Sequence, residues 1–209
     1  MNTIQQANHI SLKDLDRATA TLFSAFENDP LMLWMFDGID NYKLNAVKVI
    51  RTWVKWTILY GLAIATPEFE AVALRKLPGK HKFTLWQMIR SSIIKTPMLV
   101  DKKIFDNIMA YDNLSLSEQH KNMKSDNFWY CWLIGTEPHH RNQGHAKKLM
   151  DYTFDQANES KLPCYLETGT HDNVALHTKR GYELKSSFVL PHSTLQVFCM
   201  AREIISTNT

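Results

Sequence analysis

Residues 127–150, NFWYCWLIGTEPHHRNQGHAKKLM, decide the fold of this chain. The run 128–134 is apolar on both alternations, which predicts a central strand covered on both of its faces. A polar loop follows, and apolar residues then recur at helical spacing from 146 to 157, which predicts an amphipathic helix. We therefore expect a mixed α/β fold in which helices flank a single sheet.

The residues after this stretch continue the alternation of strands and helices. Lys161-Leu162-Pro163 ends the first helix, and Gly181 ends a second, shorter helix. The elements expected here are a strand at 164–168, a helix at 173–180 and strands at 182–190 and 195–202. The C-terminal half is thus predicted to run strand, helix, strand, helix, strand, strand.

The N-terminal half is predicted to be mainly helical. Ser11 can cap a first helix that Asn28-Asp29-Pro30 ends, and Gly61 ends a second helix. The elements expected are helices at about 12–26 and 42–60, a β-hairpin of 62–66 and 71–75, and two or three helices within 80–124. We expect this last set to be interrupted at Thr96-Pro97 and at 113–117.

The composition is that of an ordinary globular protein. The chain has 209 residues, of which 44% are hydrophobic, and 24 Lys and Arg against 21 Asp and Glu give a net charge of +3. Because the basic residues form no long run, this charge predicts neither nucleic acid nor an acidic membrane as a partner. The longest apolar stretch, 56–65, is shorter than a membrane-spanning helix, which needs about 20 residues.

The N-terminus and the cysteines indicate the cellular compartment. Residues 1–9 are polar and lack the apolar core of a secretory signal, so we expect a cytoplasmic protein. Cys131, Cys164 and Cys199 are odd in number, and each lies in an apolar run. We interpret them as reduced thiols of the core.

The loop 141–147 has the composition of a phosphate-binding loop. Gly144 lies between the buried strand and the amphipathic helix, where a missing side chain lets backbone N–H groups approach a ligand. The start of the helix adds partial positive charge, and Arg141, Lys147 and Lys148 add whole charges. The alternative is that Gly144 is only a turn residue and that the basic side chains form a solvated face.

The residues on either side of this loop resemble those of a known enzyme superfamily. Thr136-Glu137-Pro138 precedes an Arg-x-x-Gly-x-Ala motif at 141–146, and Leu166-Glu167-Thr168 and the segment 173–182 follow. In order and spacing this pattern resembles the GCN5-related N-acetyltransferase (GNAT) superfamily. It is similar especially to the branch that contains puromycin N-acetyltransferase, because the segments 25–30 and 199–202 also look similar. The resemblance is specific over 127–202 and thin over 31–126.

The resemblance implies one N-acetyltransferase domain over 1–209, with acetyl-CoA as its co-substrate. Residues 1–60 would be N-terminal helices, 80–124 a helical insertion near the acceptor site, and 127–202 the acetyl-CoA-binding core. The sheet would splay into a V at its central strand, the pyrophosphate would lie on the loop, and Gly135 would let the pantetheine arm approach closely. The residues implied to bind the coenzyme are Ile134, Gly135, Thr136, Arg141, Asn142, Gln143, Gly144, His145, Ala146, Lys147 and Asn173. A backbone N–H near Ile134 would donate to the thioester oxygen. Asn173 would bind the pantetheine by its amide, cap its helix, or do both.

Two residues are candidates for acid and base catalysis. Glu167 lies on the opposite alternation from Cys164 and Leu166, and the matching glutamate of similar enzymes acts as the base that deprotonates the amine. The alternative for Glu167 is a strand-end carboxylate paired with a lysine. His177 stands where the family pattern has a tyrosine, and an imidazole can donate a proton to the leaving thiolate. The alternative for His177 is a residue that only packs beside the coenzyme.

We therefore expect an acyltransferase that moves acetyl from acetyl-CoA to a primary amine, most simply that of a small molecule, by direct attack in a ternary complex. The alternatives are acetylation of a protein N-terminus or lysine, an acetyl-CoA sensor without turnover, and a protein-interaction domain. His139, His140 and His145 occupy the coenzyme loop without Asp or Cys beside them, so we expect no metal. The sequence gives no indication of the oligomeric state.

Overall fold

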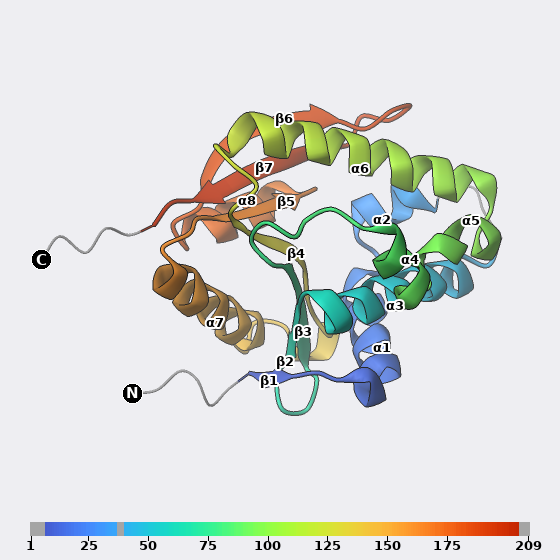
Figure 1. The fold of residues 1–209 in the computed structure, drawn as a ribbon, viewed down its shortest axis with the longest axis horizontal. Coiled ribbons are helices and arrows are strands. Elements are labelled where there is room, and N and C mark those ends of the chain that lie inside the picture. The colour runs from blue at the N-terminus through green and yellow to red at the C-terminus, as the bar shows by residue number, and fades with distance from the viewer. Residues whose placement is uncertain (1–6, 37–39, 205–209) are drawn as a thin grey trace, which may run out of the picture.

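The computed structural model of the chain describes residues 7–36 and 40–204. The segment 1–9, on which the expectation about a secretory signal rests, lies mostly outside these residues. A mixed sheet of seven strands in the order β1-β2-β3-β4-β5-β7-β6 runs through the molecule (Figure 1). The strands are β1 Asn8–His9, β2 Leu62–Ala65, β3 Ala71–Lys76, β4 Trp129–Thr136, β5 Cys164–Thr168, β6 Glu183–Val189 and β7 Gln196–Arg202. The mixed α/β class and the single sheet predicted from the sequence are confirmed.

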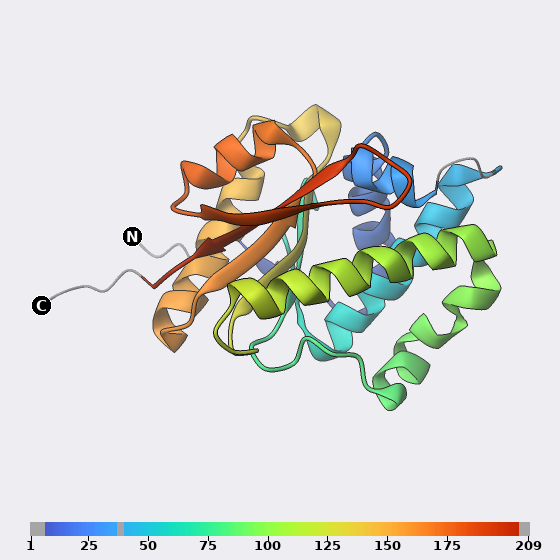
Figure 2. The ribbon, with the colours of Figure 1, turned by 90° about the horizontal axis from the view of Figure 1, so that it is seen from above.

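Helices cover both faces of the sheet. They are α1 Leu15–Phe26, α2 Pro30–Met35, α3 Tyr42–Tyr60, α4 Leu85–Ser91, α5 Thr96–Leu99, α6 Lys102–Asn122, α7 His145–Ser160 and α8 His171–Thr178. Short 3₁₀ turns lie at Leu12–Asp14, Ile93–Lys95 and Pro138–His140. In Figure 2 the helix α6 crosses the same side of the molecule as α3, with the β6–β7 hairpin beside it. No helix of the described residues is both long enough and apolar enough to cross a membrane.

The central strand β4 separates from its neighbour β5 along most of its length. The two strands are parallel and pair only at Trp129 with Cys164 and at Tyr130 with Tyr165. On its other edge β4 pairs with β3 as far as Thr136. The edge of β4 that faces β5 is therefore without a strand partner beyond Tyr130, which is the splayed arrangement expected from the sequence.

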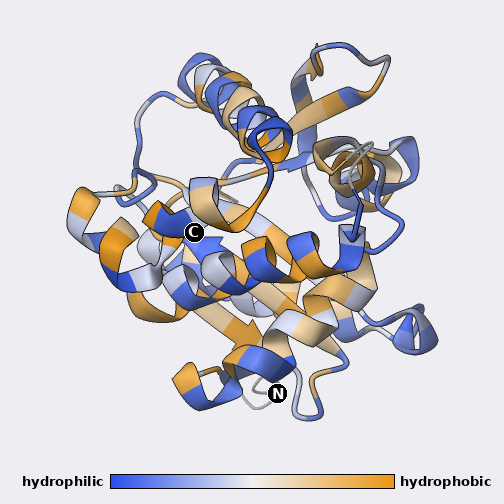
Figure 3. Cartoon of the chain, turned by 90° about the vertical axis from the view of Figure 1, so that its right-hand side faces the viewer, coloured by the Kyte–Doolittle hydropathy of each residue, from blue (hydrophilic) through white to orange (hydrophobic). Residues whose placement is uncertain are grey.

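The two faces of the sheet carry separate apolar cores. Helices α1 and α3 cover one face and α7 covers the other. In Figure 3 the helices that face the viewer carry both hydrophobic and hydrophilic residues. Along β5, Tyr165 belongs to the core of the first face, whereas Cys164 and Leu166 belong to the core of the second. Glu167, which follows Leu166, therefore faces the same side as Tyr165, as the alternation predicts.

The segment Asn28-Asp29-Pro30 does more than end the first helix. The carboxylate of Asp29 accepts hydrogen bonds from the N–H groups of Leu31 and Met32, and Pro30 is the first residue of α2. An aspartate followed by proline is a strong start signal for a helix as well as a stop. The sequence prediction missed α2 because it interpreted Asn28-Asp29-Pro30 only as the end of the preceding helix.

The long helix α6 runs without a break through 113–117, where the sequence predicted an interruption. Asn113 and Ser117 lie on its exposed side, whereas Ser115 is buried on the side that faces the sheet. The polar residues of this segment thus either face solvent or make a buried contact, and they do not break the helix. Thr96-Pro97 likewise begins the short helix α5, because proline suits the first turn of a helix.

Gly135 of β4 is required by the packing of α1. A Cβ atom at this position would lie 2.6 Å from the Cβ of Ala25 and 3.0 Å from Cε2 of Phe26. We expect Gly135→Ala to lower the free energy of unfolding by about 1 to 3 kcal/mol, because the helix must move away from the strand. Urea denaturation measures this loss.

Gly169→Ala is the matched control for this substitution. The nearest atom to its added Cβ would be the Cβ of Leu31, at 4.0 Å. The control should therefore cost much less stability than Gly135→Ala. Equal losses in the two variants would show that α1 does not pack on β4 in this way.

Candidate active site

Glu167 is the acceptor of a dense set of hydroxyl hydrogen bonds. Its Oε2 accepts from the phenols of Tyr111 at 2.8 Å and Tyr130 at 2.7 Å, and its Oε1 accepts from Tyr165 at 3.2 Å. The hydroxyl of Ser115 lies within 2.7 to 2.8 Å of both oxygens. These donors come from α6, β4 and β5. The carboxylate therefore links α6 to both strands at the split, the gap where β4 separates from β5. Glu167 itself is only partly buried.

The tyrosines around Glu167 are held in their protonated form. Burial, followed by the negative charge of Glu167, raises the pKa of Tyr111 and of Tyr130 well above the ordinary value. The pKa of Tyr165 is raised for the same two reasons. A phenol that stays protonated donates a hydrogen bond to the nearest carboxylate. The cluster therefore orients Glu167 at neutral pH with its oxygens facing hydroxyl groups.

Two further charged groups lie near Glu167, and the sequence prediction missed both. Lys76 ends β3 and is 7% exposed, and burial lowers the pKa of its ammonium to about 8 against the opposing effect of Asp112 and Glu167. Burial raises the pKa of Asp112 on α6 to about 6, with the charge of Lys76 opposing the rise. The ammonium of Lys76 therefore lies between two acids, Asp112 and Glu167.

The free edge of β4 presents two backbone N–H groups toward the split. The N–H of Glu137 donates to the carbonyl of Glu70 at 2.9 Å, which lies on the β3 side. Because successive N–H groups point to opposite edges of a strand, that of Gly135 also points to β3, and those of Ile134 and Thr136 point to the free edge. Gly135 thus makes room for α1, and the close approach of a coenzyme there stays a prediction.

The loop after β4 has a backbone suited to an anion. Asn142 and Gly144 have positive φ angles of 62° and 83°, and Gly144 is the N-cap residue of α7. Within the described residues the N–H groups of Gln143, Gly144 and His145 donate to no acceptor. A Cβ at Gly144 would meet no atom within 4 Å. Unpaired N–H groups facing open space at a helix start fit a phosphate group, so the residues present fit the coenzyme that the sequence implied.

The side chains of this loop are partly engaged in fixing it. Arg141 donates to the carbonyl of Ala25 at 2.9 Å, which ties the loop to the end of α1. Gln143 donates to the carbonyl of His139 at 3.2 Å, and the Nδ1 of His145 lies 3.9 Å from a carboxylate oxygen of Glu70. The loop is therefore positioned by its side chains, while the backbone N–H groups of Gln143, Gly144 and His145 stay unpaired.

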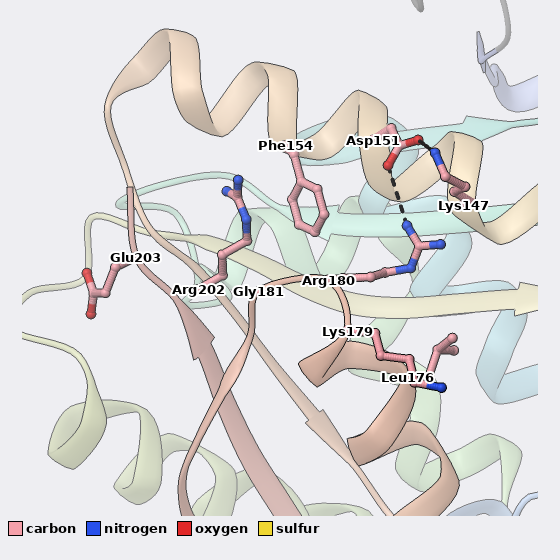
Figure 4. Close-up of a pocket in the computed structure, with 9 residues that line it drawn as sticks. All are labelled: Lys147, Asp151, Phe154, Leu176, Lys179, Arg180, Gly181, Arg202 and Glu203. Carbon is pink, nitrogen blue, oxygen red and sulfur yellow. Dashed lines mark hydrogen bonds and ion pairs between the residues drawn. The ribbon is translucent and has the colours of Figure 1, made fainter. Parts of the chain in front are cut away.

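A basic hollow of about 590 Å³ adjoins the loop between α7, α8 and the end of β7 (Figure 4). Asp151 pairs with Lys147 and with Arg180, and Arg202 lies 4.3 Å from the ring centroid of Phe154. With Lys179, the hollow has four cationic side chains against the carboxylates of Asp151 and Glu203. This excess of positive charge favours an anionic group.

His177 is buried against the second core of the sheet. Its ring makes an edge contact with Tyr182, and its Nδ1 has no hydrogen-bond partner in the described part of the chain. Burial, followed by the charges of Arg75 and Arg180, lowers the pKa of His177 to about 4. The imidazole is therefore neutral at pH 7, and its Nδ1 is enclosed by the surrounding side chains.

The pH dependence of stability tests this environment of His177. The unfolded chain binds a proton at this residue below about pH 6.5, whereas the folded chain does so only near pH 4. The free energy of unfolding should therefore fall between pH 6.5 and 4, by about 3 kcal/mol from this residue. His177→Phe should remove that part of the fall and leave the similar contribution of His81, whose pKa is also lowered to about 4.

Urea denaturation at pH 7 and pH 4.5 measures the difference. His139→Phe, at an exposed position of the loop, is the control and should keep the wild-type pH dependence. An unchanged pH dependence in His177→Phe would show that the imidazole is not buried in its neutral form.

Asn173 does not cap its helix. The cap of α8 is Thr170, whose hydroxyl accepts from the N–H of Asn173 at 3.3 Å. The side-chain amide of Asn173 makes no hydrogen bond within the described residues and is half-buried. Of the two roles that the sequence left open, capping is wrong, and the role in coenzyme binding stays a prediction.

The structure thus divides the predicted residues into two groups. Ile134, Thr136 and the loop 141–147 lie along the free edge of β4 and the start of α7, and Glu167 lies across the split on β5. His177 lies on the opposite face of the sheet from Glu167, with Tyr182 of the second core. The hydroxyl cluster and Lys76 were missed, because no spacing in the sequence brings α6 and β3 to Glu167.

The chain is similar in sequence or in fold to known acetyltransferases. A model of the acetyltransferase (GNAT) family matches residues 97–182. An uncharacterized N-acetyltransferase of Schizosaccharomyces pombe is 23% identical over 197 residues, covering 91% of this chain and 79% of that protein. A Corynebacterium glutamicum structure described as histone acetyltransferase HPA2 and related acetyltransferase has a TM-score of 0.67 and 16% identity, covering 98% of each chain. The Drosophila melanogaster polyamine N-acetyltransferase has a TM-score of 0.66 and 9% identity, covering 95% of this chain and 99% of that one.

Proposed function

We propose that this protein, an acetyltransferase of the GNAT type by its family match and its relative, transfers acetyl from acetyl-CoA to a primary amine of a small molecule. The observation that carries the proposal is the place of Glu167. Its carboxylate lies on β5 opposite the free edge of β4, within a cluster of hydroxyl donors.

The loop and the strand edge would hold the coenzyme. The unpaired N–H groups of Gln143, Gly144 and His145, with Asn142, Ala146, Arg141 and Lys147 around them, are proposed to bind the pyrophosphate. Ile134 and Thr136 would bind the pantetheine arm by their outward N–H groups, with Gly135 between them and the amide of Asn173 opposite. One of these N–H groups would stabilise charge on the thioester oxygen. Acetyl-CoA supplies the activated acetyl group when it is bound.

Glu167 is proposed to take the proton that the acceptor ammonium must lose. A lysine-like ammonium has a pKa near 10, so at neutral pH the amine needs a base before it can act as a nucleophile. The carboxylate can accept the proton directly, or through one of the hydroxyl groups that already donate to it. The short distances from Ser115, Tyr111 and Tyr130 support this relay.

His177 is proposed to donate a hydrogen bond to the departing thiolate of the coenzyme. Because its pKa is lowered to about 4, the group that acts at pH 7 is the neutral imidazole and not the imidazolium. This role is weaker than that of a full acid. The place of His177 in the sequence, where the family pattern has a tyrosine, supports the assignment.

Two features support a small acceptor. Helix α6 contacts Glu167 directly through Tyr111 and Ser115, so it covers the base on the side away from the sheet. The structurally similar Drosophila protein is named for polyamines, which are small molecules. The puromycin N-acetyltransferase-like branch is a finer proposal, and only the similarity of the segments 25–30 and 199–202 supports it.

Release of free thiol from acetyl-CoA, measured over a panel of primary amines, tests this function. We expect turnover with at least one small amine and none without an amine. A melting-temperature shift by acetyl-CoA without turnover on any amine, N-terminal peptide or lysine peptide would indicate a sensor. Turnover with peptides alone would indicate a protein acetyltransferase.

A further inference from the structure

Lys76 lies in a cage of aromatic rings beside the candidate active site. Its Nζ is 4.4 Å from the ring centroid of Trp132, 4.5 Å from that of Phe83, 5.4 Å from that of Tyr130 and 5.8 Å from that of Trp56. The faces of such rings attract a cation, and they do so more strongly when water is excluded. The four rings thus form a built site for one ammonium ion, which a residue of the chain itself fills.

The cage and the proposed base share a wall. The ring of Tyr130 faces Lys76, while the phenol of the same residue donates to Glu167 at 2.7 Å. Asp112 and Glu167 are the two acids whose negative charge acts on Lys76. One tyrosine side chain therefore separates the ammonium in the cage from the carboxylate that would receive the proton of the acceptor.

We propose that Lys76 determines specificity by acting as a built-in second cation, so that the acceptor is an amine with a single positive charge. This inference rests on the proposed function and deepens it by naming the class of acceptor. Asp112 and Glu167 already have one cationic partner, Lys76. A diamine would have to place its second ammonium beside Lys76, where like charges repel strongly because little water screens them.

The four rings of the cage are not equally buried. Phe83 and Trp132 are only half-buried, whereas Trp56 and Tyr130 form the closed side. Lys76→Ala would therefore leave an empty cage beside Asp112, into which the far ammonium of a diamine fits. Lys76→Met would fill the cage with an uncharged chain of similar length and would remove only the repulsion.

The experiment compares alkylamines with diamines of equal length, from propylamine and 1,3-diaminopropane to pentylamine and 1,5-diaminopentane. In the wild type we expect kcat/KM to favour each monoamine over its diamine by about tenfold or more. In Lys76→Ala the ratio should move toward the diamine by about tenfold, and in Lys76→Met by about threefold. Lys80→Ala, at an exposed position near the end of the same segment, is the control and should keep the wild-type ratio.

A binding readout separates this inference from the proposed function. Ethylammonium should raise the melting temperature of Lys76→Ala by more than it raises that of the wild type or of Lys80→Ala, because only in Lys76→Ala can it also refill the cage. If the wild type acetylates no amine but ethylammonium stabilises Lys76→Ala by more than the wild type, the proposed function is wrong and the cage is confirmed as an ammonium site. If amines are acetylated but neither variant changes the diamine ratio, Lys76 does not determine specificity. Should Lys76→Ala fail to fold, the ratio in Lys76→Met decides.

Discussion

Glu167→Gln should lower kcat/KM for the acceptor amine by about a hundredfold at pH 7.5. The amide keeps the shape of the carboxylate, and the hydroxyl groups of Tyr111, Ser115 and Tyr130 can reorient to donate to its oxygen and accept from its nitrogen. What the variant loses is the capacity to take a proton. The defect should shrink as the pH approaches the pKa of the acceptor ammonium, about 10, because more of the amine is then already deprotonated.

This pH dependence distinguishes a base from a residue that only supports the fold. Glu159→Gln, on the exposed end of α7, is the matched control and should keep wild-type kinetics. Acetyl-CoA should shift the melting temperature of Glu167→Gln as it shifts that of the wild type. A variant that keeps wild-type turnover at pH 7.5, or loses rate equally at every pH, would remove Glu167 from the role of base.

Gly144→Asp should weaken acetyl-CoA binding by about a hundredfold. An aspartate at a φ of 83° strains the backbone, and its side chain enters the open space in front of the N–H groups of Gln143 and His145. Its negative charge then repels a diphosphate at the helix start, where the partial charge of the helix favours an anion. Isothermal titration with acetyl-CoA measures the loss.

Gly79→Asp provides a control with the same local geometry. Gly79 has a φ of 70°, and a Cβ there would also meet no atom within 4 Å, so the two substitutions impose similar backbone strain. Gly79 lies after β3, and its N–H donates to the carbonyl of Asp126. Equal affinities in the two variants would show that the coenzyme does not use the loop of Gly144.

The elements with strong periodicity could be predicted from the sequence. The helix Tyr42–Tyr60 and the strand Cys164–Thr168 have the bounds that their apolar spacing and their stop residues indicate. The errors lie where one residue type serves two purposes. Asp29 both follows α1 and caps α2, and the polar residues at 113–117 belong to the exposed side of α6 and to the contact with Glu167.

The candidate site could be predicted only in part, for a related reason. The alternation of β5 fixes the face of Glu167, and the position of Gly144 fixes the loop, because both depend on neighbours in the chain. The hydroxyl cluster and the aromatic cage join α3, α6, β3, β4 and β5, and contacts between such distant segments leave no spacing in the sequence. The burial of His177 likewise depends on a residue outside its own helix, Tyr182.

The central claim is that the backbone N–H groups at the start of α7 and the free edge of β4 hold acetyl-CoA. Amide ¹H–¹⁵N spectra recorded during a titration with acetyl-CoA test it most directly. We expect the largest shifts at Gln143, Gly144 and His145, with further shifts at Ile134 and Thr136. A titration that leaves the amides of the loop unmoved, whether or not acetyl-CoA binds elsewhere, would contradict the account.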